Sequence, residues 1–248
     1  KYCKKKNIKF LSSVFGIKSF HILHSLGVKK IKIPSGEINN IPLLKHISKF
    51  KKEIILSTGM ANMKEVSQAV NVLSQNKISK KQITVMHCNT DYPTKIEDVN
   101  LNTMVEMGKK LKVNIGYSDH TNSTLVPIVA AAMGALYIEK HFTISKKLIG
   151  PDHKASLESK DLRKLINDVK IVNKIRGNSI KKPTKSEKIN IKIVRKSLYA
   201  KEEIKIGEKF TNNNLKICRP ALGLSPKNYY KFIGKKSERN FKKNQLIK

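Results

Sequence analysis

Short apolar runs rich in β-branched residues alternate with amphipathic stretches from residue 8 to about residue 173. The runs that predict strands are 8–13, 29–34, 53–58, 83–89, 113–117 and 135–141. Between them, apolar residues recur at helical spacing, as in Val66, Ala69, Val70 and Leu73. Such βα repeats predict a parallel sheet covered by helices. A doubly wound sheet and a barrel both remain open, and a complete barrel needs eight units where this pattern offers about six.

The pattern changes after about residue 175. Residues 176–191 are polar and predict a linker between a first domain, 1–175, and a second domain, 192–248. In the second domain, short strand-like pieces at Ser197–Ala200 and Leu215–Cys218 are separated by glycines and prolines. We expect a β-rich domain of roughly 55 residues, a size that is small for independent stability.

The charge of the chain changes this picture little. The chain has 51 Lys and Arg residues but only 18 Asp and Glu residues, which gives a net charge of +33. Such an excess of positive charge is typical of proteins that bind nucleic acid or an anionic membrane surface. The basic residues, however, are mostly lysines scattered through every segment beside abundant Ile and Asn, a usage typical of an AT-rich genome. We predict no nucleic-acid partner and no membrane partner, and keep a non-catalytic polyanion-binding protein as the alternative.

The cysteines and the hydropathy of the sequence bear on the cellular compartment of the protein. Cys3, Cys88 and Cys218 lie far apart, so their spacing predicts neither a disulfide framework nor a zinc knuckle. No apolar run reaches the roughly 18 residues of a membrane helix, and no signal-peptide pattern opens the sequence. We expect a cytoplasmic protein. The opening K-Y-C-K-K-K reads like the end of a helix, and we expect the biological start to lie upstream.

Polar residues follow every predicted strand. They are L-S-S (11–13), P-S-G-E (34–37), S-T-G-M (57–60), H-C-N-T-D-Y-P (87–93), Y-S-D-H-T (117–121) and E-K-H-F-T (139–143). Because active sites of parallel βα folds lie at the carboxyl ends of the strands, these segments predict one shared site.

The side chains in these segments suggest two kinds of chemistry. Hydroxyl, amide and ammonium groups that could hold an anion such as phosphate come from Ser13, Lys32, Ser57, Asn89 and Ser118, with strand-end capping as the alternative. His120 and His141 end adjacent strands and could share one metal ion. Glu37 could act as an acid, a base or a hydroxyl acceptor, or be a solvated loop carboxylate. His87 is expected to face the core or a neighbouring strand.

The ordered set of motifs resembles the N-acetylneuraminate (sialic acid) synthase family. The barrel motifs are I-K-I-P-S-G-E, L-S-T-G-M-A, H-C-N-T-D-Y-P-T, G-Y-S-D-H-T, E-K-H-F-T and G-P-D-H-K-A-S. R-K-S-L-Y-A, I-G-E, R-P-A-L-G-L-S-P and I-G-K-K resemble the antifreeze-like (SAF) domain that follows the barrel in those enzymes. The resemblance extends over residues 8–247.

This resemblance implies an enzyme that condenses phosphoenolpyruvate with N-acetylmannosamine or a related 2-acylamino sugar and releases phosphate. His120 and His141 match the ligands of a divalent metal, usually Mn²⁺, with Mg²⁺ or Co²⁺ as alternatives. Phosphoenolpyruvate contacts correspond to Lys32, Ser57, Asn89 or Thr90, Ser118 and, with a weaker match, Ser13. Residues around the amino sugar correspond to Glu37, Tyr92 and Asp152. The G-P-D-H-K-A-S segment fits the sialate and legionaminate branches better than the pseudaminate branch.

Two further expectations come from the family pattern. Arg219 matches an arginine that reaches the partner subunit's barrel, which implies a domain-swapped homodimer. The family's first two βα units would lie upstream of residue 1, so we expect an incomplete barrel and an incomplete site in the residues given. A catalytically inactive fragment is therefore a further alternative.

Overall fold

The computed structural model describes all 248 residues, which divide into two compact units, Lys1–Gly177 and Asn178–Lys248. The first unit is built on one parallel sheet. Its strands are β1 (Lys30–Ile33), β2 (Glu53–Ser57), β3 (Ile83–Cys88), β4 (Asn114–Asp119) and β5 (Tyr137–Lys140). They pair in the order of the sequence. This order excludes the doubly wound alternative, in which the strand order reverses within the sheet.

The sheet curls until its first and fifth strands face each other across the inner side. β1 and β5 are not hydrogen-bonded neighbours, yet Lys30 Nζ donates to the Tyr137 hydroxyl at 2.7 Å. Lys32 Nζ likewise lies 2.7 Å from a carboxylate oxygen of Glu139. In a flat sheet, four spacings of about 4.8 Å would separate these two strands. The predicted incomplete (β/α) barrel is therefore confirmed.

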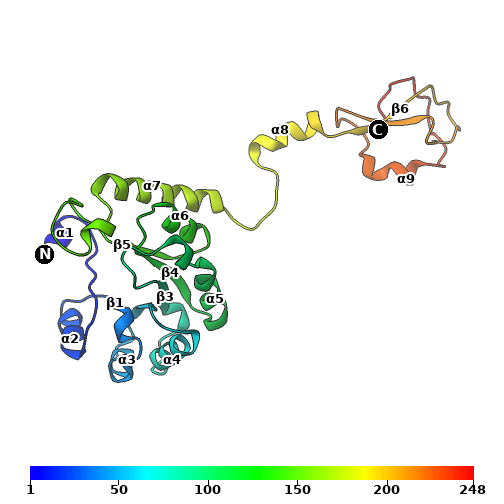
Figure 1. Cartoon of the computed structure of the whole chain (residues 1–248). Coiled ribbons are helices and arrows are strands. Elements are labelled where there is room, and N and C mark those ends of the chain that lie inside the picture. Colours follow the sequence, from blue (N-terminus) through cyan, green and yellow to red (C-terminus); the bar gives the residue numbers. More distant parts are fainter. The chain divides into compact units, whose positions relative to one another are not determined.

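Helices cover the outer face of the curled sheet. They are α2 (Ile17–Ser25), α3 (Ile41–Ser48), α4 (Met63–Ser74), α5 (Leu101–Leu111), α6 (Leu125–Ala132) and α7 (Ser159–Arg176), with α1 (Tyr2–Lys5) preceding them. Figure 1 shows α2 to α7 following one another around the strands. The predicted apolar positions of α4 are buried, and its first turn is held by a capping box between Asn62 and Glu65.

The alternation along β1 separates an apolar outer face from a charged inner face. In β1, Ile31 and Ile33 pack in the core beneath the helices, whereas Lys30 and Lys32 make their contacts across the inner side. Short 3₁₀ turns extend the loops at η1 (Ser35–Glu37), η2 (Lys80–Gln82), η3 (Ile96–Asp98) and η4 (His153–Ala155). The inner face of β1 is thus the one that carries its charged side chains.

The first predicted strand, 8–13, is wrong. Ile8, Phe10 and Leu11 are exposed. The segment approaches β1 only at its end, where a single parallel bridge joins Ser13 to Lys32. A strand requires repeated pairing with a neighbouring strand, and an apolar composition alone does not supply that neighbour. The sheet therefore has five strands, one fewer than the apolar runs predict.

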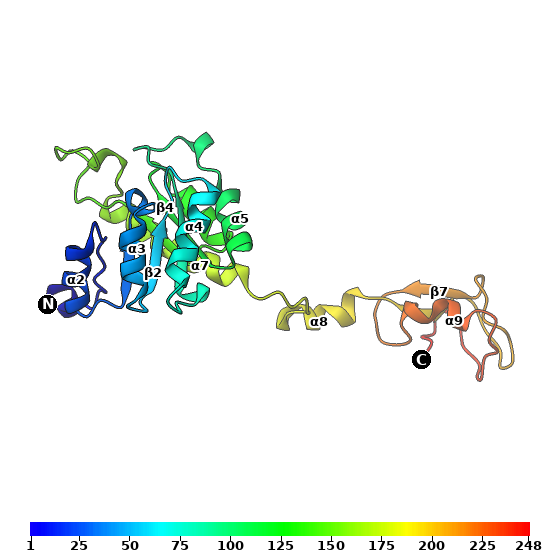
Figure 2. The same cartoon turned by 90° about the horizontal axis from the view of Figure 1, so that it is seen from below.

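The second unit contains both of the strands predicted for it. β6 (Ser197–Ala200) pairs antiparallel with β7 (Leu215–Cys218). Their small core also receives side chains from α9 (Tyr229–Phe232), which lies close to β7 in Figure 2, after η5 (Pro226–Asn228). Helix α8 (Lys185–Val194) occupies part of the segment predicted as a linker and begins at a capping box between Thr184 and Glu187.

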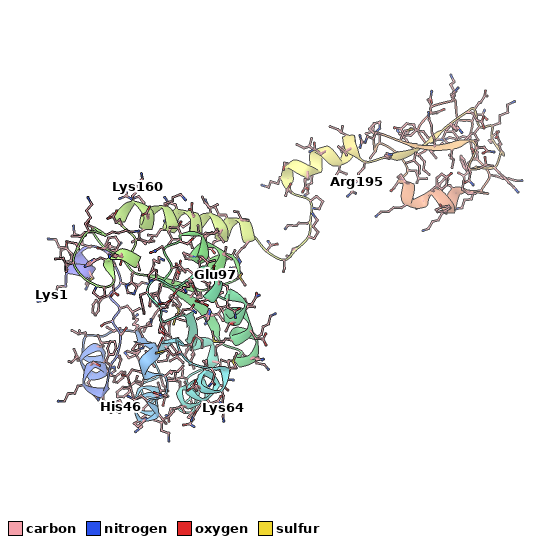
Figure 3. All side chains as sticks on the ribbon, viewed as in Figure 1. Lys1, His46, Lys64, Glu97, Lys160 and Arg195 are labelled. Carbon is pink, nitrogen blue, oxygen red and sulfur yellow. The ribbon has the colours of Figure 1, made fainter.

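The exposed surface of the outer helices carries lysines. Lys64 of α4 and Lys160 of α7 are exposed, and both point away from the sheet (Figure 3). None of the helices combines the length and the hydropathy that a membrane crossing requires. All three cysteines are free.

Candidate active site

Two histidines meet where β4 and β5 end. The ring centroids of His120 and His141 are 5.2 Å apart. His120 Nδ1 lies 2.5 Å from the Asn89 carbonyl oxygen. Because a carbonyl oxygen only accepts, Nδ1 carries the proton and Nε2 keeps its lone pair. Burial lowers the pKa of His120, and the neighbouring His141 lowers this pKa further, although the Asn89 hydrogen bond opposes the shift.

This arrangement fits a metal ligand. A metal-binding histidine is neutral and usually donates its other N–H to a carbonyl or carboxylate oxygen, as His120 does to Asn89. No group of three or more His, Cys, Asp or Glu side chains is gathered for a metal ion. Two imidazoles would therefore leave the remaining coordination positions to water or to oxygen atoms of a substrate.

Tyr92 and Asp152 border the two histidines. The Tyr92 ring centroid lies 4.2 Å from that of His120 and 5.5 Å from that of His141. Asp152 Oδ2 lies 3.8 Å from His141 Nδ1. Burial raises the pKa of the Tyr92 phenol, and the nearby Cys88 and Asp152 raise this pKa further. The tyrosine is therefore a neutral hydroxyl group beside the histidines.

A second polar group lies beside the histidines on the inner face. Lys32 Nζ contacts both Glu139 oxygens, at 2.9 and 2.7 Å, and Ser118 Oγ donates to Glu139 Oε1 at 2.7 Å. Ser118 Oγ is also 3.5 Å from His120 Nε2. Burial acts to raise the pKa of Glu139, but Lys32 and Ser118 outweigh it and hold this pKa below its usual range. The carboxylate is therefore ionised.

Two predicted anion contacts hold unused hydrogen-bonding capacity. Ser57 Oγ and Asn89 Oδ1 are buried and have no hydrogen-bond partner. Asn89 Nδ2 donates to the Asp98 carbonyl oxygen at 2.8 Å. Buried polar atoms are paired in most proteins, so unpaired ones at the end of a strand mark places where a ligand would complete the pairing.

The other predicted residues lie near the site or apart from it. Ser13 is bridged to Lys32. Thr90 is exposed, and its methyl group lies so close to Gly59 that a Cβ there would come within 2.6 Å of it. Glu37 accepts a hydrogen bond from Asn40 Nδ2 at 2.6 Å. Arg219 belongs to the second unit, where its Nε donates to the Val194 carbonyl oxygen at 2.7 Å.

The sequence interpretation missed three charged residues in the strand ends. Glu139 holds the two anion contacts Lys32 and Ser118. On the outer face, Asp119 and Lys140 form a buried ion pair at 2.6 Å. The sequence signal for these three residues was the presence of charged side chains inside the motifs S-D-H and E-K-H. Alternation sends the middle residue of each motif to the face opposite its neighbours. His87, expected to face the core or a neighbouring strand, contacts the Val99 carbonyl oxygen at 2.8 Å.

A curled parallel sheet that collects polar side chains at its carboxyl ends defines the (β/α)-barrel class of enzymes. The chain belongs to the NeuB family, whose model matches residues 1–181, and the SAF domain model matches residues 195–248. The resemblance to the N-acetylneuraminate synthase family is thereby confirmed.

Named relatives and a solved structure support this membership. The chain is 49% identical over 247 residues to the N,N'-diacetyllegionaminic acid synthase of Campylobacter jejuni, covering all of this chain and 74% of that protein. It is 36% identical to the enzyme of the same name from Legionella pneumophila, covering 94% of this chain and 66% of that protein. The crystal structure of N-acetylneuraminic acid synthetase from Leptospira borgpetersenii aligns with a TM-score of 0.71 at 35% identity, over 76% of this chain and 65% of that one.

Proposed function

We propose that this protein condenses phosphoenolpyruvate with a 2-acylamino sugar to give a nonulosonic acid and phosphate. In this reaction C3 of phosphoenolpyruvate bonds to the aldehyde carbon of the sugar, water adds to C2, and phosphate leaves. The observation that carries the proposal is the 3.5 Å approach of Ser118 Oγ to His120 Nε2. This short distance places the anion site around Lys32 directly beside the histidine pair, at the same end of the curled sheet.

The first substrate would be held through its anionic groups. Lys32 and Ser118 offer an ammonium and a hydroxyl group to phosphate oxygens, and such charge-assisted bonds are among the stronger ones in proteins. Ser57 adds a buried hydroxyl without a partner. Asn89 or Thr90 would add a further contact, and Ser13 lies beside Lys32.

The second substrate would lie toward the histidines. We infer that His120 and His141 hold a divalent metal, Mn²⁺ in the first instance, with Mg²⁺ or Co²⁺ as alternatives. Bound there, such an ion would act as a Lewis acid on the aldehyde oxygen of the sugar. Tyr92 and Asp152 border the same space and would contact the sugar hydroxyl groups, and Glu37 would serve as acid or base. Arg219 would contact the acyl group in the barrel of a second copy, within a homodimer.

Among the acylamino sugars, we propose one that carries two acetamido groups. The support is the 49% identity to a synthase whose product bears two N-acetyl groups. N-acetylmannosamine, with one acetamido group, is the competing substrate, and it corresponds to the sialic acid synthetase that aligns with this chain. The ratio of kcat/KM for the two sugars distinguishes these branches.

The test is phosphate release from phosphoenolpyruvate with each sugar and Mn²⁺. His120→Ala and His141→Ala should each lower the rate about 100-fold or more, because loss of a group that only orients a metal ligand already costs roughly 10–100-fold. His46→Gln, on the outer helix α3, is the matched control and should leave the rate within twofold. The assay is run on this chain and on a chimera that adds the quarter of the Campylobacter relative outside the matched region. Wild-type rates that survive exhaustive chelation would contradict the metal assignment, and no turnover of either sugar by the folded chimera would contradict the function.

A further inference from the structure

We propose that Glu139 sets the affinity threshold of the anion site, because its carboxylate occupies the donors that a bound phosphate would use. This inference rests on the proposed function, in which Lys32 and Ser118 hold the phosphate of the first substrate. Glu139 itself acts as an internal competitor, since an incoming anion must displace it.

The contacts of Glu139 match those of a bound oxyanion. Lys32 Nζ lies 2.9 Å from one carboxylate oxygen and 2.7 Å from the other. Ser118 Oγ donates to Glu139 Oε1 at 2.7 Å. The protein thus satisfies its own anion-binding donors with an internal carboxylate.

The two sides of this ion pair differ in accessibility. The Lys32 side chain is only 7% exposed, whereas the Glu139 side chain is 42% exposed. The ammonium group is therefore held inside the curled sheet, and the carboxylate is the partner with space to move. An arriving anion would reach Lys32 by taking the position that Glu139 holds.

Displacement of the Glu139 carboxylate costs every incoming anion the same free energy, which only a strongly bound anion can exceed. A monoanionic carboxylate offers Lys32 the same two oxygens that Glu139 already supplies, and it also loses translational freedom on binding. A phosphate dianion brings a second charge and a third oxygen. Ser57, on the neighbouring strand β2, has a buried hydroxyl group that no internal partner uses and that this oxygen could engage. The internal carboxylate therefore leaves simple carboxylates unbound at concentrations where a phosphoryl group still binds.

Calorimetry with inorganic phosphate and with pyruvate, in the presence of a chelator, tests this proposal on the whole chain. In Glu139→Gln the Lys32 charge is no longer neutralised, so phosphate should bind about tenfold more tightly. Pyruvate should gain by a comparable factor, because both anions displace the same carboxylate. Glu53→Gln is the matched control. Glu53 pairs with Lys30 on the same inner face, near the opposite strand ends, and 50% of its side chain is exposed. This variant should leave both affinities within twofold.

The outcomes separate this inference from the proposed function. Phosphate binding that is unchanged or weaker in folded Glu139→Gln overturns the role of Glu139, while a loss of binding in Lys32→Met would still support the anion site. If Lys32→Met binds phosphate as tightly as the wild type does, both the role of Glu139 and the proposed anion site are contradicted. If circular dichroism shows that Glu139→Gln is unfolded, Glu139→Asp decides. It keeps the charge but draws it back by one methylene, and it should tighten phosphate binding by a smaller factor; no tightening overturns the proposal.

Discussion

The two faces of the curled sheet hold polar groups in different ways. On the outer face, the Asp119 and Lys140 side chains pair at 2.6 Å and are 0% and 3% exposed. Asp119 also accepts from the Thr121 amide, and Lys140 donates to the Thr121 carbonyl oxygen. On the inner side of the same sheet, Ser57 Oγ and Asn89 Oδ1 remain without partners. The outer groups saturate one another, whereas these two inner atoms keep bonding capacity for a ligand.

This contrast separates structural from functional groups within a single strand. Asp119 lies between Ser118 and His120, and Lys140 lies between Glu139 and His141. Alternation places the middle residues beneath the helices and the flanking residues at the mouth. The outer ion pair therefore lies directly behind the residues proposed to bind substrate and metal, and it links the two strand ends that carry them.

The largest effect is expected from breaking the outer pair. Asp119→Ala leaves the Lys140 ammonium group buried without its counter-charge, which should cost about 3–5 kcal/mol in the free energy of unfolding. Burial already lowers the pKa of Lys140, against the opposing effect of Asp119. Urea unfolding followed by circular dichroism measures the loss.

The control for this prediction removes both charges. Asp119→Ala/Lys140→Met should recover most of the stability, since no uncompensated charge is left inside. A double variant as unstable as the single one would show that the loss does not come from an unpaired charge.

A smaller effect is expected from filling the inner face. A Cβ at Gly116 would lie 2.3 Å from Met86 Sδ and 2.9 Å from the Tyr137 carbonyl oxygen. Met86 can move but the β5 backbone cannot easily do so, so Gly116→Ala should cost about 1–3 kcal/mol. Gly36→Ala is the matched control, because a Cβ at Gly36 would have no atom within 4 Å and the backbone there is not left-handed. Equal stability of the two variants would contradict the tight inner packing.

The smallest effect concerns pH and the dry outer face. Burial lowers the pKa of His87, although its hydrogen bond to the Val99 carbonyl oxygen opposes the shift. Because the pKa is lower in the folded state, the unfolded chain binds more protons as the pH falls below about 6.5, and stability decreases there. The free energy of unfolding should fall between pH 7 and pH 5 by up to about 1 kcal/mol more in the wild type than in His87→Gln. Equal pH dependence in the two proteins would place His87 in a solvated environment.

Much of the site could be predicted because strand ends are encoded locally. The predicted segments 83–89 and 113–117 overlap β3 and β4, and both are followed by the expected polar residues. His120 and His141 do meet. Glu139 was missed because its importance comes from Lys32, which is 107 positions away in the sequence. Glu37 was predicted as a site residue, but the hydrogen bond that its carboxylate makes is a local one with Asn40.

Local periodicity and ordered motifs were enough to establish the alternation of strands and helices, the polar strand ends and the family. Which of these residues are paired depends on tertiary contacts. K-I-K-I in β1 has the alternation of a strand with one solvated face, yet the curl of the sheet buries Lys32 against Glu139. Segment 8–13 has the composition of a strand but meets β1 at one bridge only. Both outcomes depend on which strands lie side by side, and hydrogen bonding and charge pairing between distant segments cannot be read from spacing along the chain.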